Sequence, residues 1–374
     1  MRQRILVYGG MLLIAAGSLT AANVLIPADA RTLAALVALA AYFLLSRLWL
    51  RLLRWRIPVS VTRECSIATP PDRAWKLLSS AEAWSLRPGH HAFDVPPPAG
   101  MPPLRVIARV RSGRAGCSAM ELAVPPAAGQ PGKSLIIRST GLPAPAAVTL
   151  TIRVAPEGSG TRATITARQP AKLGAWLDVK AKGGGNLADW LSECGAVLTG
   201  RRDWPGQAVR PDVLAALAAP LPAGKTVEAS ASVLIAVPPA RVWQATWDPA
   251  TSLALPESNT VAAGFVPGAP VGRPGEIQYS IARSPRHGQR MLAHLQYVRE
   301  FEPGRMALTR VTGLIGCEVL HLVELAPGGT RFTLTFRFTD ARVRRAKEKV
   351  QADTEKEVAK YKVLLEGTSA AQRA

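Results

Sequence analysis

Histidines are the side chains in this sequence best suited to acid–base chemistry, because their ordinary pKa lies near neutrality. None has the spacing of a metal motif such as H-E-x-x-H, and no Ser–His–Asp arrangement or dinucleotide fingerprint follows from the spacing. His294 shares strand parity with Leu292 and Gln296, which leaves both faces of the strand open, so a buried general base is one interpretation. We predict no metal and no cofactor, and leave the catalytic residues unknown. The histidines are His90 and His91, in a Pro/Gly-rich segment expected to face solvent, and His287, His294 and His321.

Residues 127–134 read AAGQPGKS and resemble a relaxed phosphate-binding loop. Such a loop needs a strand before it and a helix after it, so that backbone amides and the helix dipole face the phosphates. Here the strand-like LIIRST follows, and Pro131 removes one amide from the cradle. We interpret the segment as a hairpin turn.

The net charge of +20 in 374 residues raises nucleic acid as a partner. The aromatic residues, however, do not interleave with the arginines as a base-stacking surface requires. The basic excess is also densest beside apolar runs near the N-terminus, where a membrane surface explains it. We therefore expect no nucleic-acid partner. Four isolated cysteines, without a C-x-x-C motif, fit a reducing compartment rather than a disulfide framework.

Two apolar runs predict a membrane anchor in residues 1–56. The stretch from 5 to 26 has no charged residue, and at 1.5 Å per helical residue it can cross a bilayer core of about 30 Å. The second run, 32–50, is long enough once Arg47 extends its charged end to the interface. We expect two transmembrane helices, at about 5–26 and 32–50; a buried pair of core helices is the alternative. The ADA at 28–30 resembles a signal-peptidase site, which leaves cleavage of the first span open.

Arginines flank these two runs on the same side. Arg2 and Arg4 precede the first run, and a set of four lies at the end of the second run or just after it: Arg47, Arg51, Arg54 and Arg56. By the positive-inside rule both ends lie in the cytoplasm. The prediction is a multi-pass protein of the cell membrane, with the rest of the chain on the cytoplasmic side.

An internal repeat organises the remainder of the chain. IATPPDRAW at 67–75 and IAVPPARVW at 235–243 agree at six of nine positions, and GTRATIT at 160–166 matches GTRFTLT at 329–335 at five of seven. Matches at a nearly constant offset indicate two copies of one domain, each of about 140 residues.

The second copy shows its elements most clearly. A strand precedes Pro238 and Pro239, and two short helical segments follow. Phe332, Leu334 and Phe336 alternate with polar residues, as in an antiparallel strand over a core. The extended runs are 228–237, 276–282, 289–300, 305–312, 318–325 and 331–339, and residues 341–366 form a long helix that ends at Gly367.

This order of elements resembles the helix-grip fold of the START/Bet v 1-like superfamily, also called SRPBCC, with the polyketide cyclase/dehydrase group the nearest relatives. The resemblance is carried by PPDRAW and PPARVW after the first strands, by the REFEPGRMALTR hairpin at 299–310, and by the closing helix. It implies a curved antiparallel sheet that grips the last helix and leaves an apolar cavity, and it indicates a cavity rather than a reaction. The expected fold class is α+β: two tandem helix-grip domains behind two transmembrane helices.

We place the first SRPBCC-like domain at 57–200, a linker at 201–225, the second domain at 226–367 and a tail at 368–374. The linker is rich in proline and semi-rigid, with one or two helical turns at 211–219.

The first copy departs from the pattern in two ways. Its strand turns Ala163, Ile165 and Ala167 inward where the second copy has larger side chains. Its last helix contains three consecutive glycines, 183–185, so we expect two helical pieces, 172–182 and 186–199. A roomier pocket and a degraded copy kept for scaffolding are both open interpretations.

The leading hypothesis is a membrane-anchored, non-enzymatic binding or carrier protein for a hydrophobic small molecule or lipid. The alternatives are a cyclase/aromatase-type enzyme acting on a polyketide-like substrate and a scaffold with filled cavities. Protein partners, ligand identity and oligomeric state stay unknown. The ligand-binding residues that we predict are Trp243, Trp247, Tyr279, His294, Phe332, Phe336 and Tyr361; for Trp243 the alternative is a core residue at the end of the cavity.

Overall fold

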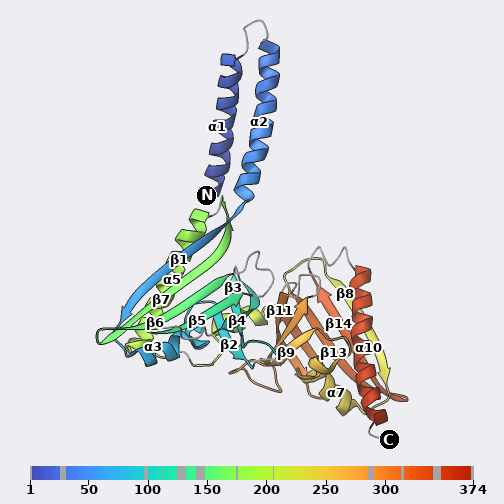
Figure 1. Cartoon of the computed structure of the whole chain (residues 1–374). Coiled ribbons are helices and arrows are strands. Elements are labelled where there is room, and N and C mark those ends of the chain that lie inside the picture. Colours follow the sequence, from blue (N-terminus) through green and yellow to red (C-terminus); the bar gives the residue numbers. More distant parts are fainter. Residues whose placement is uncertain are drawn as a thin grey trace.

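The computed structural model combines a helical hairpin with two seven-stranded antiparallel sheets (Figure 1). The residues that it describes are 2–25, 31–96, 100–111, 113–123, 132–139, 148–173, 176–204, 206–284, 290–312, 316–339 and 347–371. This is the α+β architecture that the sequence predicts.

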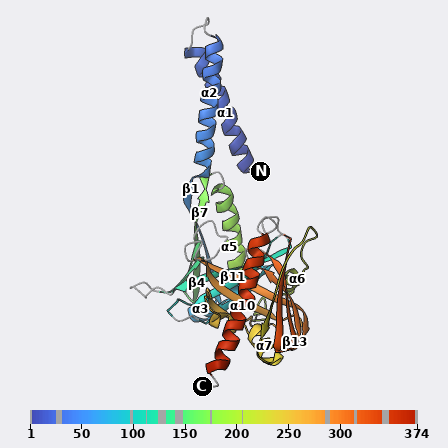
Figure 2. The ribbon, with the colours of Figure 1, turned by 90° about the vertical axis from the view of Figure 1, so that its right-hand side faces the viewer.

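The hairpin consists of α1 (Arg2–Leu25) and α2 (Arg31–Arg54), which lie side by side and project away from the sheets (Figures 1 and 2). Among the described residues, one helix is long and apolar enough to cross a membrane: the segment Ala35–Leu53 of α2, with a mean hydropathy of 1.7. The apolar part of α1, Tyr8–Ala21, is shorter. Residues 26–30, which hold the end of the first expected span and the ADA sequence, lie outside the described part.

The first sheet has the spatial order β1-β7-β6-β5-β4-β3-β2, and α5 lies along β1 and β7. Strand β1 follows α2 directly and pairs with β7 over its whole length. The elements are β1 (Arg56–Ile67), α3 (Pro71–Leu78), α4 (Glu82–Ser85), β2 (His90–Val95), β3 (Leu104–Arg111), β4 (Arg114–Ala123), β5 (Lys133–Ser139), β6 (Thr149–Glu157), β7 (Gly160–Lys172) and α5 (Trp176–Leu198).

The second sheet repeats this topology with the order β8-β14-β13-β12-β11-β10-β9, and α10 lies along β8 and β14. In both copies the second proline of the repeated string is the first residue of a helix, where a missing N–H costs nothing. The elements are β8 (Val227–Ile235), α7 (Pro239–Trp247), α8 (Thr251–Ala254), β9 (Thr260–Phe265), β10 (Ile277–Ser284), β11 (Arg290–Glu302), β12 (Met306–Thr312), β13 (Cys317–Ala326), β14 (Gly329–Phe338) and α10 (Lys347–Ala371).

Three details of the predicted elements are wrong. Helix α5 continues through Gly183–Gly185 instead of dividing into two pieces. A Cβ at Gly184 would lie 2.4 Å from a guanidinium nitrogen of Arg63, so the glycine lets the Arg63 side chain from β1 lie against the helix. Helix α10 runs past Gly367 to Ala371, and its expected first residues, 341–346, lie outside the described part. Strand β9 has no counterpart in the prediction, because TVAAGF is short and contains small residues.

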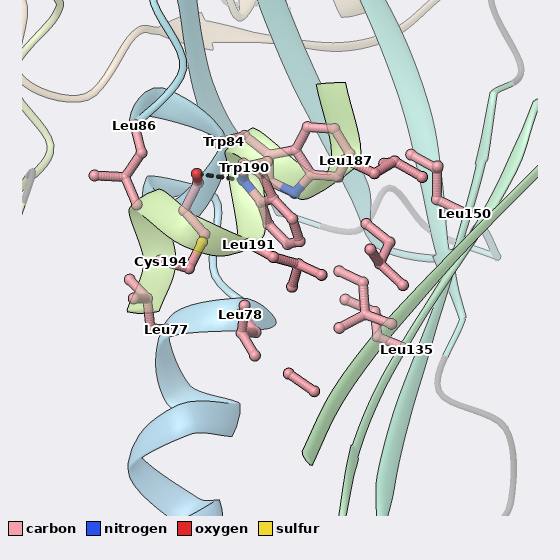
Figure 3. Close-up of a cluster of buried hydrophobic side chains, with 14 of the residues drawn as sticks. Leu77, Leu78, Trp84, Leu86, Leu135, Leu150, Leu187, Trp190, Leu191 and Cys194 are labelled. Carbon is pink, nitrogen blue, oxygen red and sulfur yellow. Dashed lines mark hydrogen bonds between the residues drawn. The ribbon is translucent and has the colours of Figure 1, made fainter. Parts of the chain in front are cut away.

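The core of the first unit is filled by side chains from α3, α4, α5 and the sheet (Figure 3). Trp84 and Trp190 lie with their ring centroids 5.5 Å apart, and Trp190 donates a hydrogen bond to the Ala83 carbonyl at 2.7 Å. Leu77, Leu78 and other leucines pack around this pair, as Figure 3 shows. The two tryptophans therefore pack α4 against α5.

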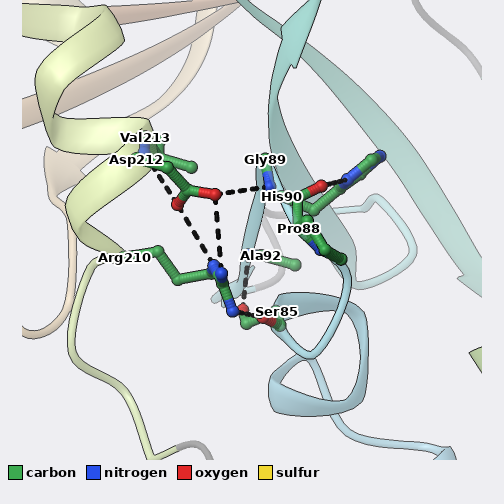
Figure 4. Close-up of polar contacts among 8 residues, drawn as sticks. All are labelled: Ser85, Pro88, Gly89, His90, Ala92, Arg210, Asp212 and Val213. Atoms are coloured by element: carbon green, nitrogen blue, oxygen red, sulfur yellow. Dashed lines mark hydrogen bonds and ion pairs between the residues drawn. The ribbon is translucent and has the colours of Figure 1, made fainter. Parts of the chain in front are cut away.

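The two units pack against each other through a shared apolar cluster. It joins β2, β3 and β4 to β9, β10 and β11, with linker helix α6 (Pro211–Ala218) packed against both sheets. At the start of α6, Asp212 accepts hydrogen bonds from the Gly89 amide at 2.7 Å and from Arg210, which also reaches the Ser85 carbonyl (Figure 4). The helical turns expected at 211–219 are present, and they connect the units rather than separating them.

Candidate functional site

A cavity of about 440 Å³ lies inside the second unit, between its sheet and helices α7 and α10. Its walls come from β9 to β14 on one side and from α7, the turn after it, and α10 on the other. This volume falls within the range of small-molecule sites, roughly 300–1,000 Å³.

Five of the seven predicted ligand-binding residues line this cavity: Trp247, Tyr279, His294, Phe336 and Tyr361. The other two, Trp243 and Phe332, lie behind the lining. Phe332 is fully buried, with its ring 5.3 Å from that of Tyr361. These two residues support side chains of the wall, which is the core role weighed for Trp243 above.

Tryptophans of α7 form one end of the wall. Trp243 and Trp247 are four residues apart, so they lie on the same helix face, and their rings stack at 5.5 Å with an interplanar angle of 6°. Phe301 of β11 contacts both rings, at 5.6 Å and 4.9 Å. The resulting cluster fixes the orientation of Trp247, whose indole Nε1 is buried without a hydrogen-bond partner among the described residues.

Two histidines face the same cavity from different strands, His294 on β11 and His321 on β13. Burial lowers the pKa of His321 to about 4, and neither of its ring nitrogens has a partner among the described residues. Burial also lowers the pKa of His294, and a hydrogen bond to the Thr312 backbone offsets part of this effect. Both imidazoles are therefore neutral at pH 7.

Phenol and amide groups complete the polar part of the lining. Gly264 of β9 leaves room for the Tyr279 ring, since a Cβ there would lie 3.0 Å from its hydroxyl oxygen. Burial raises the pKa of Tyr279, and burial together with Glu357 raises that of Tyr361, so both phenols stay protonated. Gln278 donates to the Trp247 carbonyl at 3.2 Å, which ties β10 to the end of α7.

Sequence reasoning missed several polar residues of the lining, among them His321, Gln278, Gln296 and Ser280. A signal for His321 was present, because it shares strand parity with Val319 and Val323, which are buried on the core face. No comparable signal marks Gln278, since its inward direction follows from the packing of β10 between β9 and β11.

The other described histidines and the four cysteines, which the sequence offers for catalysis or metal binding, do not belong to the lining of this cavity. The described residues contain no cluster of metal-ligating side chains, and the four cysteines are free thiols. The expectation that His90 and His91 face solvent is wrong: both belong to β2, and His91 is buried against the second unit, in a small cavity with Phe93 and Pro267. His287 and most of the loop at 127–134 lie outside the described residues, although a strand, β5, does follow that loop.

Comparisons with known proteins find solved structures that are similar to this chain. The fold described above, two seven-stranded antiparallel sheets each with a long helix along it, is the tandem helix-grip fold. Among solved structures the chain is similar to the di-domain ARO/CYC BexL from the BE-7585A biosynthetic pathway, at 13% identity over 82% of this chain and 98% of that chain, with a TM-score of 0.31. The di-domain ARO/CYC StfQ from the steffimycin pathway gives 11% identity over 83% and 99%, also with a TM-score of 0.31. A protein from Nitrosomonas europaea covers 38% of this chain and 97% of its own, at 14% identity and a TM-score of 0.32.

No family model and no curated protein matches the chain. At the identities and TM-scores of the solved structures, the similarities carry no information about activity.

Proposed function

We propose that this tandem helix-grip protein is a membrane-anchored binding or carrier protein, and that the cavity of its second unit holds a largely apolar small molecule or lipid. The observation that carries the proposal is the 440 Å³ cavity, which lies between sheet and helices and combines aromatic and aliphatic side chains with polar ones. Burying apolar ligand surface there is worth about 25 cal/mol per Å² before the costs of association.

The helical hairpin supports the membrane part of the proposal. Large apolar side chains are exposed along both helices, for example Leu13, 77% exposed, and Leu44, 71% exposed. Such a surface suits contact with lipid. Residues near the start of α1 and the end of α2 lie at the end of the hairpin beside the sheets (Figure 1), where arginines are frequent. We propose that both helices cross the bilayer and that both units lie on its cytoplasmic side.

The experiment uses the full chain, purified in mild detergent from membranes of the expressing cell. Small molecules that co-purify are identified by native mass spectrometry and compared with those on an Ala263→Phe variant, whose added ring occupies the cavity. The proposal predicts a bound apolar compound on the native chain that is absent from the variant. An equal load on both proteins would contradict it.

A second candidate function, a cyclase/aromatase-type enzyme, is favoured by one specific observation. His294 and His321 line one cavity, and burial keeps both rings neutral at pH 7, the form that can accept a proton, while the lowered pKa makes each ring a weaker base. Turnover of a poly-β-ketone substrate that is lost in both His294→Gln and His321→Gln would select this candidate. Binding of the same compound without turnover would select the carrier.

A further inference from the structure

A single residue, Trp55, joins the helical hairpin to the first unit. Helix α2 ends at Arg54 and strand β1 begins at Arg56, so no loop separates them. The Trp55 amide donates to the Leu52 carbonyl at 3.0 Å, and the Trp55 carbonyl accepts from the Leu173 amide at 2.8 Å. The end of β7 and the start of α5 are thereby held beside the end of α2, as Figures 1 and 2 show.

Basic side chains from both of these chain segments lie at this junction. Arg56 and Lys172 are directly opposite each other in the pairing of β1 with β7, and both are exposed. Arg47 and Arg51 are exposed on α2 and lie about one helical turn apart. Lys180 is exposed on α5. We call these five residues the basic collar.

Few carboxylates accompany the basic collar. Elsewhere among the described residues, several surface arginines pair with carboxylates, as Arg337 does with Glu228 at 2.8 Å. Residues 47–56 and 172–180, by contrast, contain one acidic residue, Asp178. Like charges at directly opposite positions of neighbouring strands repel each other. An anion bound at the collar would therefore reduce this repulsion.

The basic collar lies where the headgroups of a bilayer are expected. Arg47 and Arg51 belong to the apolar segment Ala35–Leu53, so their guanidinium groups reach water by extending towards the end of the helix. Trp55 lies just beyond that segment and is 68% exposed, and tryptophan is enriched where a bilayer meets water. The anions at this depth are phospholipid headgroups, and the cytoplasmic leaflet carries a net negative charge.

Resting on the membrane anchor proposed above, we infer that the basic collar binds the headgroups of anionic phospholipids and that this contact holds the first unit at the bilayer surface. The guanidinium groups of Arg47 and Arg51 suit the lipid phosphate, because they donate two parallel hydrogen bonds to it. A zwitterionic lipid binds less tightly, since its ammonium group faces the positive charge of the collar. Because only Trp55 separates α2 from β1, the contact also fixes the direction of the first unit relative to the membrane.

The test uses the full chain, purified in mild detergent and examined by native mass spectrometry. Phosphatidylglycerol and phosphatidylcholine with the same acyl chains are added separately, and the apparent affinity of each bound lipid is measured. We expect phosphatidylglycerol to bind about fivefold more tightly or better, which corresponds to at least one basic residue acting on an anionic headgroup. Raising the ionic strength should reduce this preference, because salt screens exposed charges.

Variants assign the preference to the basic collar. Arg51→Gln and Lys172→Gln should each weaken the binding of phosphatidylglycerol by about three- to fivefold and leave that of phosphatidylcholine within about twofold. Lys172→Arg keeps the charge and should keep the preference. Lys356→Gln is the matched control, because this lysine is exposed on α10 of the second unit. It should change neither affinity.

The outcomes separate this inference from the anchor on which it rests. Equal affinities for the two lipids, or full retention of the preference in Arg51→Gln and Lys172→Gln, would overturn the inference. Displacement of the lipid by inorganic phosphate would assign the collar to soluble anions and would overturn it as well.

Carbonate extraction of the expressing membranes tests the anchor separately. A chain that stays in the membrane but shows no lipid preference retains the anchor and loses only the inference, whereas a chain released by carbonate loses both. Thermal unfolding of each variant identifies any loss of affinity that comes from misfolding.

Discussion

The ring of Phe93 on β2 lies 5.2 Å from the ring of Tyr279 on β10, so an aromatic pair joins the first unit to the second. Both side chains are buried, and Tyr279 also lines the cavity. Nearby, the Cys117 thiol of β4 donates to the Ala293 carbonyl at 2.9 Å, next to His294. The first unit thus supports the strands that carry two residues of the cavity wall.

Phe93→Ala tests this support. Removing a buried phenylalanine ring leaves a void, and we expect a loss of about 3–5 kcal/mol in the free energy of unfolding. The measurement is thermal or denaturant unfolding of the full chain in detergent. Leu325→Ala serves as the control, because this side chain is 81% exposed. Its free energy of unfolding should lie within about 0.5 kcal/mol of that of the native chain. Equal stabilities of the two variants would contradict a packed interface.

Gly185→Ala should stabilise helix α5. Nothing lies within 4 Å of a Cβ at this position, so the alanine gains about 1 kcal/mol of helix propensity without a clash. Gly184→Ala should gain less, because its Cβ would displace the Arg63 guanidinium. Melting temperatures of the two variants check this order, and a larger gain at Gly184 would refute the contact with Arg63.

The hairpin depends on one glycine at the contact between its helices. A Cβ at Gly10 would lie 2.3 Å from Nε1 of Trp49, whereas a Cβ at Gly9 meets nothing within 4 Å. Gly10→Ala should therefore cost about 1–3 kcal/mol through overpacking, and Gly9→Ala should not. Thermal unfolding in detergent micelles distinguishes them. Equal melting temperatures of the two variants would mean that α1 and α2 do not pack in this register.

His321 should make stability depend on pH between about 4 and 6.5. Burial lowers its folded-state pKa from 6.5 to about 4, so the unfolded chain binds the proton more readily in this window. Stability is then constant above pH 6.5 and falls as the pH decreases towards 4, by about 3 kcal/mol for this residue.

Unfolding of the native chain and of His321→Phe at pH 7.5, 5.5 and 4.5 isolates this contribution. His91, whose pKa burial also lowers to about 4, contributes with the same sign in both proteins and cancels in the difference. A native chain that loses no more stability than the variant on acidification would show that His321 is accessible to water in the folded state.

The repeat and the alternation of side chains were sufficient to predict two antiparallel sheets, each closed by a long helix. Period-two patterns such as Phe332–Leu334–Phe336 are local, because a strand at the surface of a core must turn one face inward. In each repeated string, the proline pair and the tryptophan predicted the helix that follows the first strand. This signal is also local, because it comes from residues that are neighbours in the sequence.

The continuity of α5, the interface between the units and the polar part of the cavity lining were decided by tertiary structure. The glycines of α5 remain helical because packing along β1 and β7 outweighs their low propensity. Trp247 and His321 are far apart in the chain, and their contact depends on how α7 packs across the sheet. Sequence determines the direction of a side chain from its own strand or helix, whereas the groups that it faces come from elements that only the folded chain brings together.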